Sequence, residues 1–175
     1  MEEKALYVHV PFCAHLCAYC DFPKVLYEDK WAFSYIQELK KEAASYGSLR
    51  AKTLYFGGGT PTSLSPSLLE ELLAFFAPFL VPGGEFTVEC NPENATLEKL
   101  LLLKKYGVNR LSFGVESSSP RLLLLMGRKH TFLSAQEAIA RAKSVGFANI
   151  NADLIYALPQ ESVDELQNDI RALLS

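Results

Sequence analysis

The sequence has little of what would place a protein in a membrane, outside the cell or on a nucleic acid. Apolar runs such as residues 100–103 and 122–126 are too short to span a bilayer. The start, Met1-Glu2-Glu3-Lys4-Ala5, is acidic and lacks the apolar segment of a secretory signal. A formal net charge of −3 offers no basic surplus to phosphates. We therefore expect a cytoplasmic protein with no nucleic-acid partner and at most peripheral membrane contact.

Cysteine is also scarce, and its distribution is uneven. The chain has four cysteines, of which Cys13, Cys17 and Cys20 lie close together while Cys90 stands alone. Clustered cysteines in a cytosolic chain indicate metal or redox chemistry more than a disulfide framework. Cys90 is expected to be a small buried residue at the end of a strand.

The 175 residues, 49% of them hydrophobic, suffice for one domain with an apolar core. Strands are predicted at residues 6–10, 53–56, 85–88, 110–113 and 149–156. Helices are predicted at residues 29–46, 65–80, 96–106, 134–146 and 162–174. This alternation implies parallel strands with right-handed crossovers, in either a doubly wound sheet or part of a (β/α) barrel.

Three local features are predicted with these elements. The first helix should place Trp31, Tyr35, Leu39 and Ala43 on one apolar face. Pro82-Gly83-Gly84 should form a turn before the third strand. Ser134 with Glu137 suggests a capping box that opens the fourth helix.

Residues suited to a ligand accompany the carboxyl end of every predicted strand, which is where α/β folds bind ligands. In chain order they are Cys13 with Cys17 and Cys20, Gly57-Gly58-Gly59-Thr60, Glu89 with Asn91, Gly114 with Glu116, and Asp153. Because these strand ends meet at one edge of the sheet, the pattern predicts a single site there.

The cysteines have the spacing Cys-x3-Cys-x2-Cys, and thiolates are the usual ligands of iron–sulfur clusters. A cube of four irons held by three cysteines leaves one iron open to a substrate. Two alternatives stay open at this point. A zinc site would take His9 or His15 as its fourth ligand. Alternatively, cysteines at this spacing share one face of a helix, although Pro11 and Pro23 leave little room for one.

Glycines and charged residues suggest how a ligand would be held. The triple glycine at residues 57–59 lets the backbone approach a ligand closely, and no Lys-Ser/Thr follows it as in a Walker loop. Strand-end carboxylates can accept hydrogen bonds from ribose hydroxyls. Arg128 can grip a carboxylate through two hydrogen bonds, and His130 either supports Arg128 or is exposed.

Six segments, taken in order, resemble the radical S-adenosylmethionine superfamily. More narrowly, they resemble the family of oxygen-independent coproporphyrinogen III oxidases and their HemW-type heme-chaperone relatives. The segments are YVHVPFCAHLCAYCDF at 7–22, YFGGGTPT at 55–62, VECNPE at 88–93, GVNRLSFGVES at 107–117, MGRKHT at 126–131 and NADLIYALP at 151–159. The resemblance covers nearly the whole chain.

This resemblance implies a parallel (β/α) partial barrel of radical SAM type, with five of six βα units present and the barrel open. Residues 1–175 would form an incomplete radical SAM core domain, without the sixth strand and the C-terminal domain, and with marginal stability. A [4Fe–4S] cluster would be held by Cys13, Cys17 and Cys20. S-adenosylmethionine would chelate the open iron, and one-electron reduction would release methionine and a 5′-deoxyadenosyl radical.

The resemblance also implies which residues contact the cofactor. The family's contact positions match Tyr7, Tyr19, Gly58, Gly59, Thr60, Glu89, Glu116, Arg128 and Asp153.

Three functions follow as hypotheses. A HemW-type heme chaperone is favoured, because Phe22 stands where the oxidase branch carries a further cysteine. The alternative is the oxidase, in which radical decarboxylation converts propionates into vinyl groups. A third hypothesis is a zinc-stabilised module with no redox role. The implied partners are heme or a porphyrinogen and an electron donor such as flavodoxin or ferredoxin, with heme binding expected of the full-length protein.

Two more departures from the family's pattern have physical consequences. Glu116 replaces the usual glutamine, so if it faces the ribose together with Glu89, one of their pKa values should be raised and cofactor binding should weaken at high pH. Ala157 replaces a common glycine, and Pro159-Gln160-Glu161 replaces the usual Pro-Gly-Gln.

Overall fold

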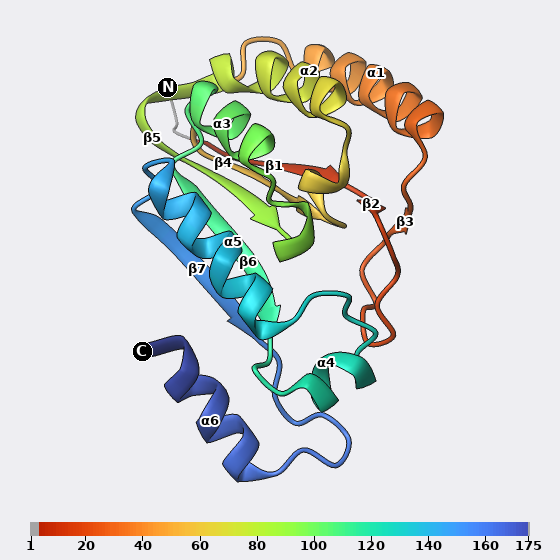
Figure 1. The fold of residues 1–175 in the computed structure, drawn as a ribbon. Coiled ribbons are helices and arrows are strands. Elements are labelled where there is room, and N and C mark those ends of the chain that lie inside the picture. Colours follow the sequence, from red (N-terminus) through yellow and green to blue (C-terminus); the bar gives the residue numbers. More distant parts are fainter. Residues whose placement is uncertain (1–3, 175) are drawn as a thin grey trace.

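The computed structural model describes residues 4–174, so the acidic residues 2–3 and the terminal Ser175 lie outside the described part. It contains a curved parallel sheet with helices packed along its outer side (Figure 1). The strands are β1 (Lys4–Val10), β4 (Ala51–Gly58), β5 (Leu80–Cys90), β6 (Arg110–Glu116) and β7 (Asn149–Leu154). Each of them overlaps a predicted strand.

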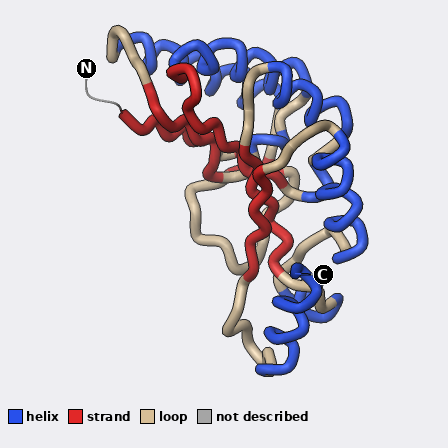
Figure 2. Tube along the Cα trace, turned by 90° about the vertical axis from the view of Figure 1, so that its left-hand side faces the viewer, coloured by secondary structure: helices blue, strands red, loops and turns tan. Residues whose placement is uncertain are grey.

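The order of these strands decides between the two predicted architectures. It is β1-β4-β5-β6-β7, and every neighbouring pair is parallel. A doubly wound sheet reverses direction part-way, whereas a barrel adds its strands in sequence. Figure 2 shows the helices gathered on one side of the strands, as this order requires. The predicted open (β/α) partial barrel with five strands is confirmed.

The five predicted helices are present with shifted ends. They are α1 (Asp29–Ser45), α2 (Pro66–Phe76), α3 (Leu97–Lys105), α5 (Phe132–Ser144) and α6 (Val163–Leu174). A further short helix, α4 (Pro120–Leu125), and a small sheet of β2 (Phe12–Cys13) with β3 (Val25–Leu26) were not predicted. Short 3-10 turns occupy Pro61–Ser63, Ala77–Phe79 and Pro92–Asn94.

The hydrophobic core lies between the helices and the outer face of the sheet. Phe56, Phe76 and Phe86 are fully buried there, and the rings of Phe56 and Phe86 meet edge-on with centroids 4.9 Å apart. Each such side chain contributes about 1.5–3 kcal/mol through removal from water. Because side chains alternate along a strand, the neighbours Tyr55 and Thr87 point to the opposite, inner face. The ligand-type residues therefore belong to the inner face and its rim.

The predicted apolar face of α1 is wrong only at Trp31, since Tyr35 and Leu39 are partly buried against the core and Ala43 is buried. The residues that α1 buries are Ala32, Ile36 and Ala43, whereas Trp31 is 59% exposed. Small alanine side chains let the helix pack closely against the sheet, and the bulky indole then lies beside the contact and not within it.

Two other local predictions also need correction. Pro82-Gly83-Gly84 lies within β5, where the pairing with β4 shifts register between Ala51 and Thr53. The predicted turn is therefore an irregularity of the strand. Helix α5 begins earlier than expected, because Thr131 is its N-cap and exchanges hydrogen bonds with Ser134, which is the third residue of the helix.

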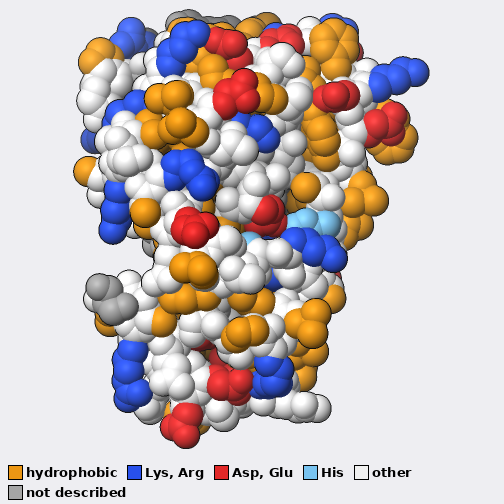
Figure 3. Space-filling model, in the orientation of Figure 1, with side chains coloured by type: hydrophobic (Ala, Val, Ile, Leu, Met, Phe, Trp, Pro, Cys, Tyr) orange, Lys and Arg blue, Asp and Glu red, His pale blue; other side chains and the backbone are white. Residues whose placement is uncertain are grey.

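Within residues 4–174, none of the helices combines the length and apolar character needed to cross a bilayer. On the face drawn in Figure 3, acidic and basic side chains are interspersed with hydrophobic ones.

Candidate functional site

A cavity of about 490 Å³ opens where the strands of the sheet end. Of the residues predicted to form a site, those that line it are Cys13, Cys17, Tyr19, Cys20, Gly58, Gly59, Thr60, Glu89, Glu116, Arg128 and Asp153. Segments far apart in the sequence thus meet around one space, as the strand-end pattern predicts.

Tyr7 is the predicted site residue that does not line this cavity. It is 56% exposed, its ring stacks on that of Tyr55 with centroids 5.8 Å apart, and its hydroxyl lies 3.3 Å from His9 Nδ1. Tyr7 is therefore connected to the cavity indirectly, through Tyr55, whose hydroxyl donates to the cavity-lining Glu89.

The three cysteines lie on a closed loop at the end of β1. The loop is fastened where β2 pairs with β3, because Val25 N donates to Pro11 O at 2.8 Å and Tyr27 N donates to Cys13 O at 2.9 Å. Residues 14–24 contain no helix, so the interpretation of three cysteines packed on one helical face was wrong. All three thiols are free and border the cavity.

Two cysteine sulfurs accept hydrogen bonds from residues on distant segments. Thr60 Oγ1 donates to Cys13 Sγ at 3.8 Å, and Arg128 Nη1 donates to Cys17 Sγ at 3.5 Å. Asn91 connects the two donors, since its amide donates to Thr60 Oγ1 at 3.0 Å and accepts from Arg128 Nη2 at 2.9 Å. Asn91 thus bridges the groups that contact two of the cysteines.

The glycines of the β4 loop are required by close packing at the rim of the cavity. Gly58 has φ +112°, and a Cβ atom there would lie 2.5 Å from the His9 ring. A Cβ on Gly59 would lie 2.6 Å from the backbone of Pro11. These glycines therefore let the β4 loop pack against the end of β1. This is a second role, beside the close approach of backbone to ligand that the sequence predicts.

Glu89 is held against the glycine loop. Its carboxylate accepts a hydrogen bond from Tyr55 Oη at 2.7 Å and another from Gly58 N at 3.1 Å. Burial raises the pKa of Glu89, and the hydrogen bonds oppose that shift while the charge of Asp153 adds to it. The side chain therefore holds a proton more readily than an ordinary glutamate.

Glu116, at the end of the neighbouring strand β6, has an unusual backbone conformation with φ +69°. Tyr19 Oη donates to Glu116 Oε1 at 3.1 Å, and Arg128 Nη2 lies 3.6 Å from the same oxygen. Burial raises the pKa of Glu116 despite the nearby charge of Arg128, and Asp153 raises it further. The raised pKa agrees with expectation, but its main cause is burial, and the carboxylate that adds repulsion to both glutamates is Asp153.

Asp153 is positioned by polar side chains on the inner face of the sheet. Ser112 Oγ donates to Asp153 Oδ2 at 3.1 Å, and Asn151 Nδ2 donates to Asp153 Oδ1 at 2.6 Å. Asn151 also donates to Ser112 Oγ at 2.9 Å. Sequence reasoning missed Ser112, although its place on the predicted fourth strand two residues before Gly114 was a usable signal.

The histidines have partners of their own. His130 is buried, with Nε2 3.0 Å from Val115 O and Nδ1 3.5 Å from Glu93 Oε2, so the hypothesis that it is exposed was wrong. His15 borders the cavity, with Nε2 3.4 Å from Glu93 Oε1. His9 Nε2 lies 2.9 Å from Pro23 O, which ties β1 to the far end of the cysteine loop.

The chemistry of this donor set fits an iron–sulfur cluster with an amino-acid-containing ligand. Three free thiols supply cluster ligands, and Arg128 Nε is a buried donor without a hydrogen-bond partner beside them. Among the described residues, no three His, Cys, Asp or Glu side chains converge on one point as ligands of a single metal ion do. Ligands of a cube each bind a different iron and need no such convergence.

Comparisons with known proteins agree with this arrangement. Residues 7–173 match the model of the Radical SAM superfamily. The chain is 40% identical to the heme chaperone HemW of Bacillus subtilis, over 98% of this chain and 47% of that protein. It is 33% identical to the oxygen-independent coproporphyrinogen III oxidase of Bradyrhizobium diazoefficiens, over 97% of this chain and 40% of that protein. The solved structure of coproporphyrinogen III oxidase (HemN) from Escherichia coli matches with a TM-score of 0.89 and 28% identity, over 98% of this chain and 41% of that one.

Proposed function

Because the chain belongs to the radical SAM superfamily, we propose that Cys13, Cys17 and Cys20 hold a [4Fe–4S] cluster and that the adjoining cavity binds S-adenosylmethionine. The observation that carries the proposal is the meeting of three free thiols, a buried guanidinium and three carboxyl groups around one cavity. When bound, the cluster would supply the electron that cleaves the cofactor.

The side chains around the cavity have distinct roles in this proposal. Arg128 has an unpartnered Nε to offer the carboxylate of the methionine moiety. Glu89, Glu116 and Asp153 can accept hydrogen bonds from the ribose hydroxyls. Thr60 and Arg128 donate hydrogen bonds to cysteine sulfurs, an arrangement that raises the reduction potential of a cluster by stabilising its extra electron.

We further propose that the chain functions as, or within, a HemW-type heme chaperone of the cytoplasm. The chain spans about half the length of the heme chaperones it matches, so heme binding and delivery would depend on more than these residues. Phe22 supports the chaperone, because this exposed side chain lines the cavity where the oxidase branch has a further cysteine. The similarity to the oxidases keeps oxidative decarboxylation of a porphyrinogen as the alternative function.

Anaerobic reconstitution with iron and sulfide tests the cluster. About four irons and four sulfides per chain are expected, with an EPR signal after reduction that shifts when S-adenosylmethionine is added. Alanine at Cys13, Cys17 or Cys20 should each abolish the cluster, whereas Cys90→Ala should retain it. Tightly bound zinc in a colourless protein, or equal loss in Cys90→Ala, would overturn the assignment.

A second measurement separates the two functions in the full-length protein. Heme binding without decarboxylation of coproporphyrinogen III is expected for the chaperone, in the presence of a reduced flavodoxin or ferredoxin. Conversion of propionate to vinyl groups would establish the oxidase instead.

A further inference from the structure

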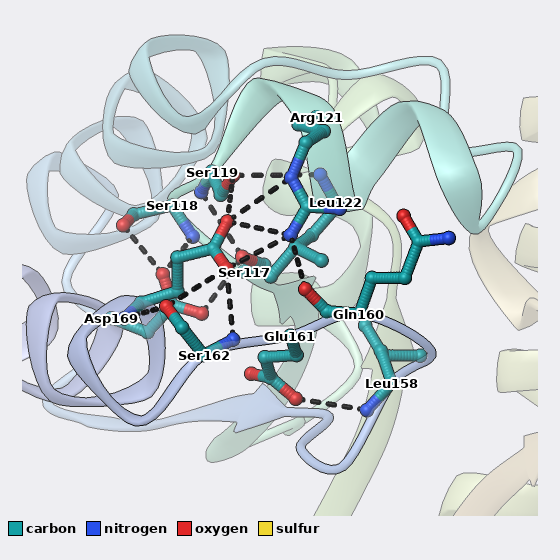
Figure 4. Close-up of polar contacts among 11 residues, drawn as sticks. Ser117, Ser118, Ser119, Arg121, Leu122, Leu158, Gln160, Glu161, Ser162 and Asp169 are labelled. Atoms are coloured by element: carbon teal, nitrogen blue, oxygen red, sulfur yellow. Dashed lines mark hydrogen bonds and ion pairs between the residues drawn. The ribbon is translucent and has the colours of Figure 1, made fainter.

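Helix α6 contacts the loop that follows Glu116 through the buried carboxylate of Asp169. Asp169, at 1% exposure, accepts hydrogen bonds at Oδ2 from Ser117 Oγ at 2.7 Å and at Oδ1 from Ser118 N at 2.6 Å. Ser118 Oγ also donates to Oδ1. Figure 4 shows Asp169 directed at this run of serines from the neighbouring helix. All three hydrogen bonds therefore come from the two residues that follow Glu116.

The same helix and loop are linked a second time at the surface. Arg121 Nη2 donates to both carboxylate oxygens of Glu165 at 2.8 Å, and Ser119 Oγ lies 3.4 Å from Glu165 Oε1 (Figure 4). This pair is more exposed than Asp169 and touches residues farther from Glu116. It therefore docks α6 without holding the backbone beside the site.

The loop needs such support because of the conformation at Glu116. A residue with a side chain in the left-handed region costs about 1–2 kcal/mol, which the surroundings must offset. Glu116 O accepts from Ile155 N at 3.0 Å on one side, while Ser117 and Ser118 are held by Asp169 on the other. The β6–β7 pairing also shifts register between Gly114 and Glu116. The carboxylate of Glu116 reaches Tyr19 and Arg128 from this backbone geometry.

We propose that Asp169 is a positioning residue for Glu116, fixing the backbone of residues 116–118 so that the Glu116 carboxylate faces the cofactor cavity. The inference rests on the proposed function, since it assumes that Glu116 contacts the cofactor. Burying a carboxylate is an unfavourable way to dock a helix. The free energy lost by desolvating the charge exceeds that gained from hydrogen bonds to neutral donors, unless those donors are well placed. Here the donors are concentrated on residues 117 and 118.

The test compares Asp169→Asn with Glu165→Gln as a matched control on the same helix. Asparagine keeps the volume but turns one acceptor into a donor facing Ser117 or Ser118. S-adenosylmethionine affinity of the reconstituted protein should fall about tenfold in Asp169→Asn, because displacement of a contact by a fraction of an ångström has effects of this order. Glu165→Gln should lower the melting temperature and leave the affinity unchanged.

A double-mutant cycle supplies a readout that a merely structural role would not move. In a Glu116→Ala background, Asp169→Asn should have no further effect on cofactor affinity, because the side chain that Asp169 positions is absent. In the apoprotein, amide hydrogen exchange of residues 116–118 should speed up in Asp169→Asn and not in Glu165→Gln.

The possible failures are distinguishable. If the wild-type protein takes up no cluster or cofactor, the proposed function fails. If it binds the cofactor and Asp169→Asn binds equally well, or if the two substitutions at 116 and 169 act additively, the positioning role is overturned alone. If Asp169→Asn does not fold, Ser118→Ala can replace it, because this substitution removes one hydrogen bond to Asp169. Ser118→Ala should weaken cofactor binding by a smaller factor. An unchanged affinity in this variant would also overturn the inference.

Discussion

Glu116 Oε1 lies 3.6 Å from Arg128 Nη2, and both side chains are almost completely buried. Proximity to a guanidinium alone would lower the pKa of the carboxyl group. The pKa of Glu116 is nevertheless raised, because burial outweighs the attraction of Arg128 and Asp153 adds repulsion. The pair therefore has a pH dependence opposite to that of a surface salt bridge.

The first prediction concerns stability and pH in the apoprotein. Since the folded state binds the Glu116 proton more tightly than the unfolded state, stability contributed by this group is lost as pH rises from the ordinary carboxyl pKa through the raised one. Glu116→Gln cannot lose a proton, so it should become increasingly more stable than wild type as the pH rises above the ordinary carboxyl pKa of 4.5. Urea unfolding at a series of pH values measures the difference.

Glu165 provides a control of opposite sign. Hydrogen bonds from Ser162 and Arg121 lower its pKa to about 2, so wild type should gain on Glu165→Gln as pH rises from 2 to 5. Parallel curves for wild type and Glu116→Gln would contradict the raised pKa. Glu116→Gln should also tighten S-adenosylmethionine binding at high pH. Unchanged or weaker binding in this variant would refute the link between the Glu116 charge and the cofactor.

The second prediction concerns Asn91, which bridges Thr60 and Arg128. Asn91→Ala removes one of the two acceptors of the buried Arg128 Nη2, the other being Gly114 O, and this should cost about 1–3 kcal/mol of unfolding free energy. In the reconstituted protein the reduction potential of the cluster should also change, because Arg128 and Thr60 would no longer be held against the cysteine sulfurs. Asn149→Ala, at an exposed position on β7, should change neither quantity measurably.

The position and hydrogen bonds of Asn91 show what the sequence could and could not predict. Strand ends follow from local patterns, so the elements, the parallel sheet and the cysteine loop were predictable, and these already place the ligand-type residues around one space. Asn91 could be placed at the site, because it follows Glu89 at a strand end, but its bridging role could not be predicted. Its role depends on Thr60 and Arg128, which are 31 and 37 residues away, and no local pattern encodes that contact. The same reason explains why Trp31 was misplaced on the α1 face: tertiary packing buries Ala32 and leaves Trp31 exposed.

The third prediction distinguishes the cysteines by reactivity. In the reduced apoprotein at pH 8, iodoacetamide should modify Cys17 and Cys20 faster than Cys13, because Cys13 is buried and burial raises its pKa. Cys90 should be slowest, since it is buried and its pKa is raised to about 12. Peptide mass spectrometry over time gives the four rates. They should become similar in urea, and equal rates for Cys90 and Cys20 without urea would contradict the buried placement of Cys90.

The last prediction uses the loop between β7 and α6. Ala157 and Gln160 have φ of +62° and +63°, and both stand where the family pattern has glycine. Side chains in this region are strained, and both residues are exposed, so replacing them with glycine removes strain without loss of packing. Ala157→Gly and Gln160→Gly should each raise the unfolding free energy by about 0.5–1 kcal/mol, after the greater entropy of glycine in the unfolded chain is deducted.

Ala140→Gly, at an exposed position inside α5, should lower the unfolding free energy by about 1 kcal/mol. Denaturant unfolding of the three variants checks this opposition of sign. A loss of stability at residues 157 and 160 similar to that at residue 140 would mean that the loop does not hold the left-handed conformation in solution.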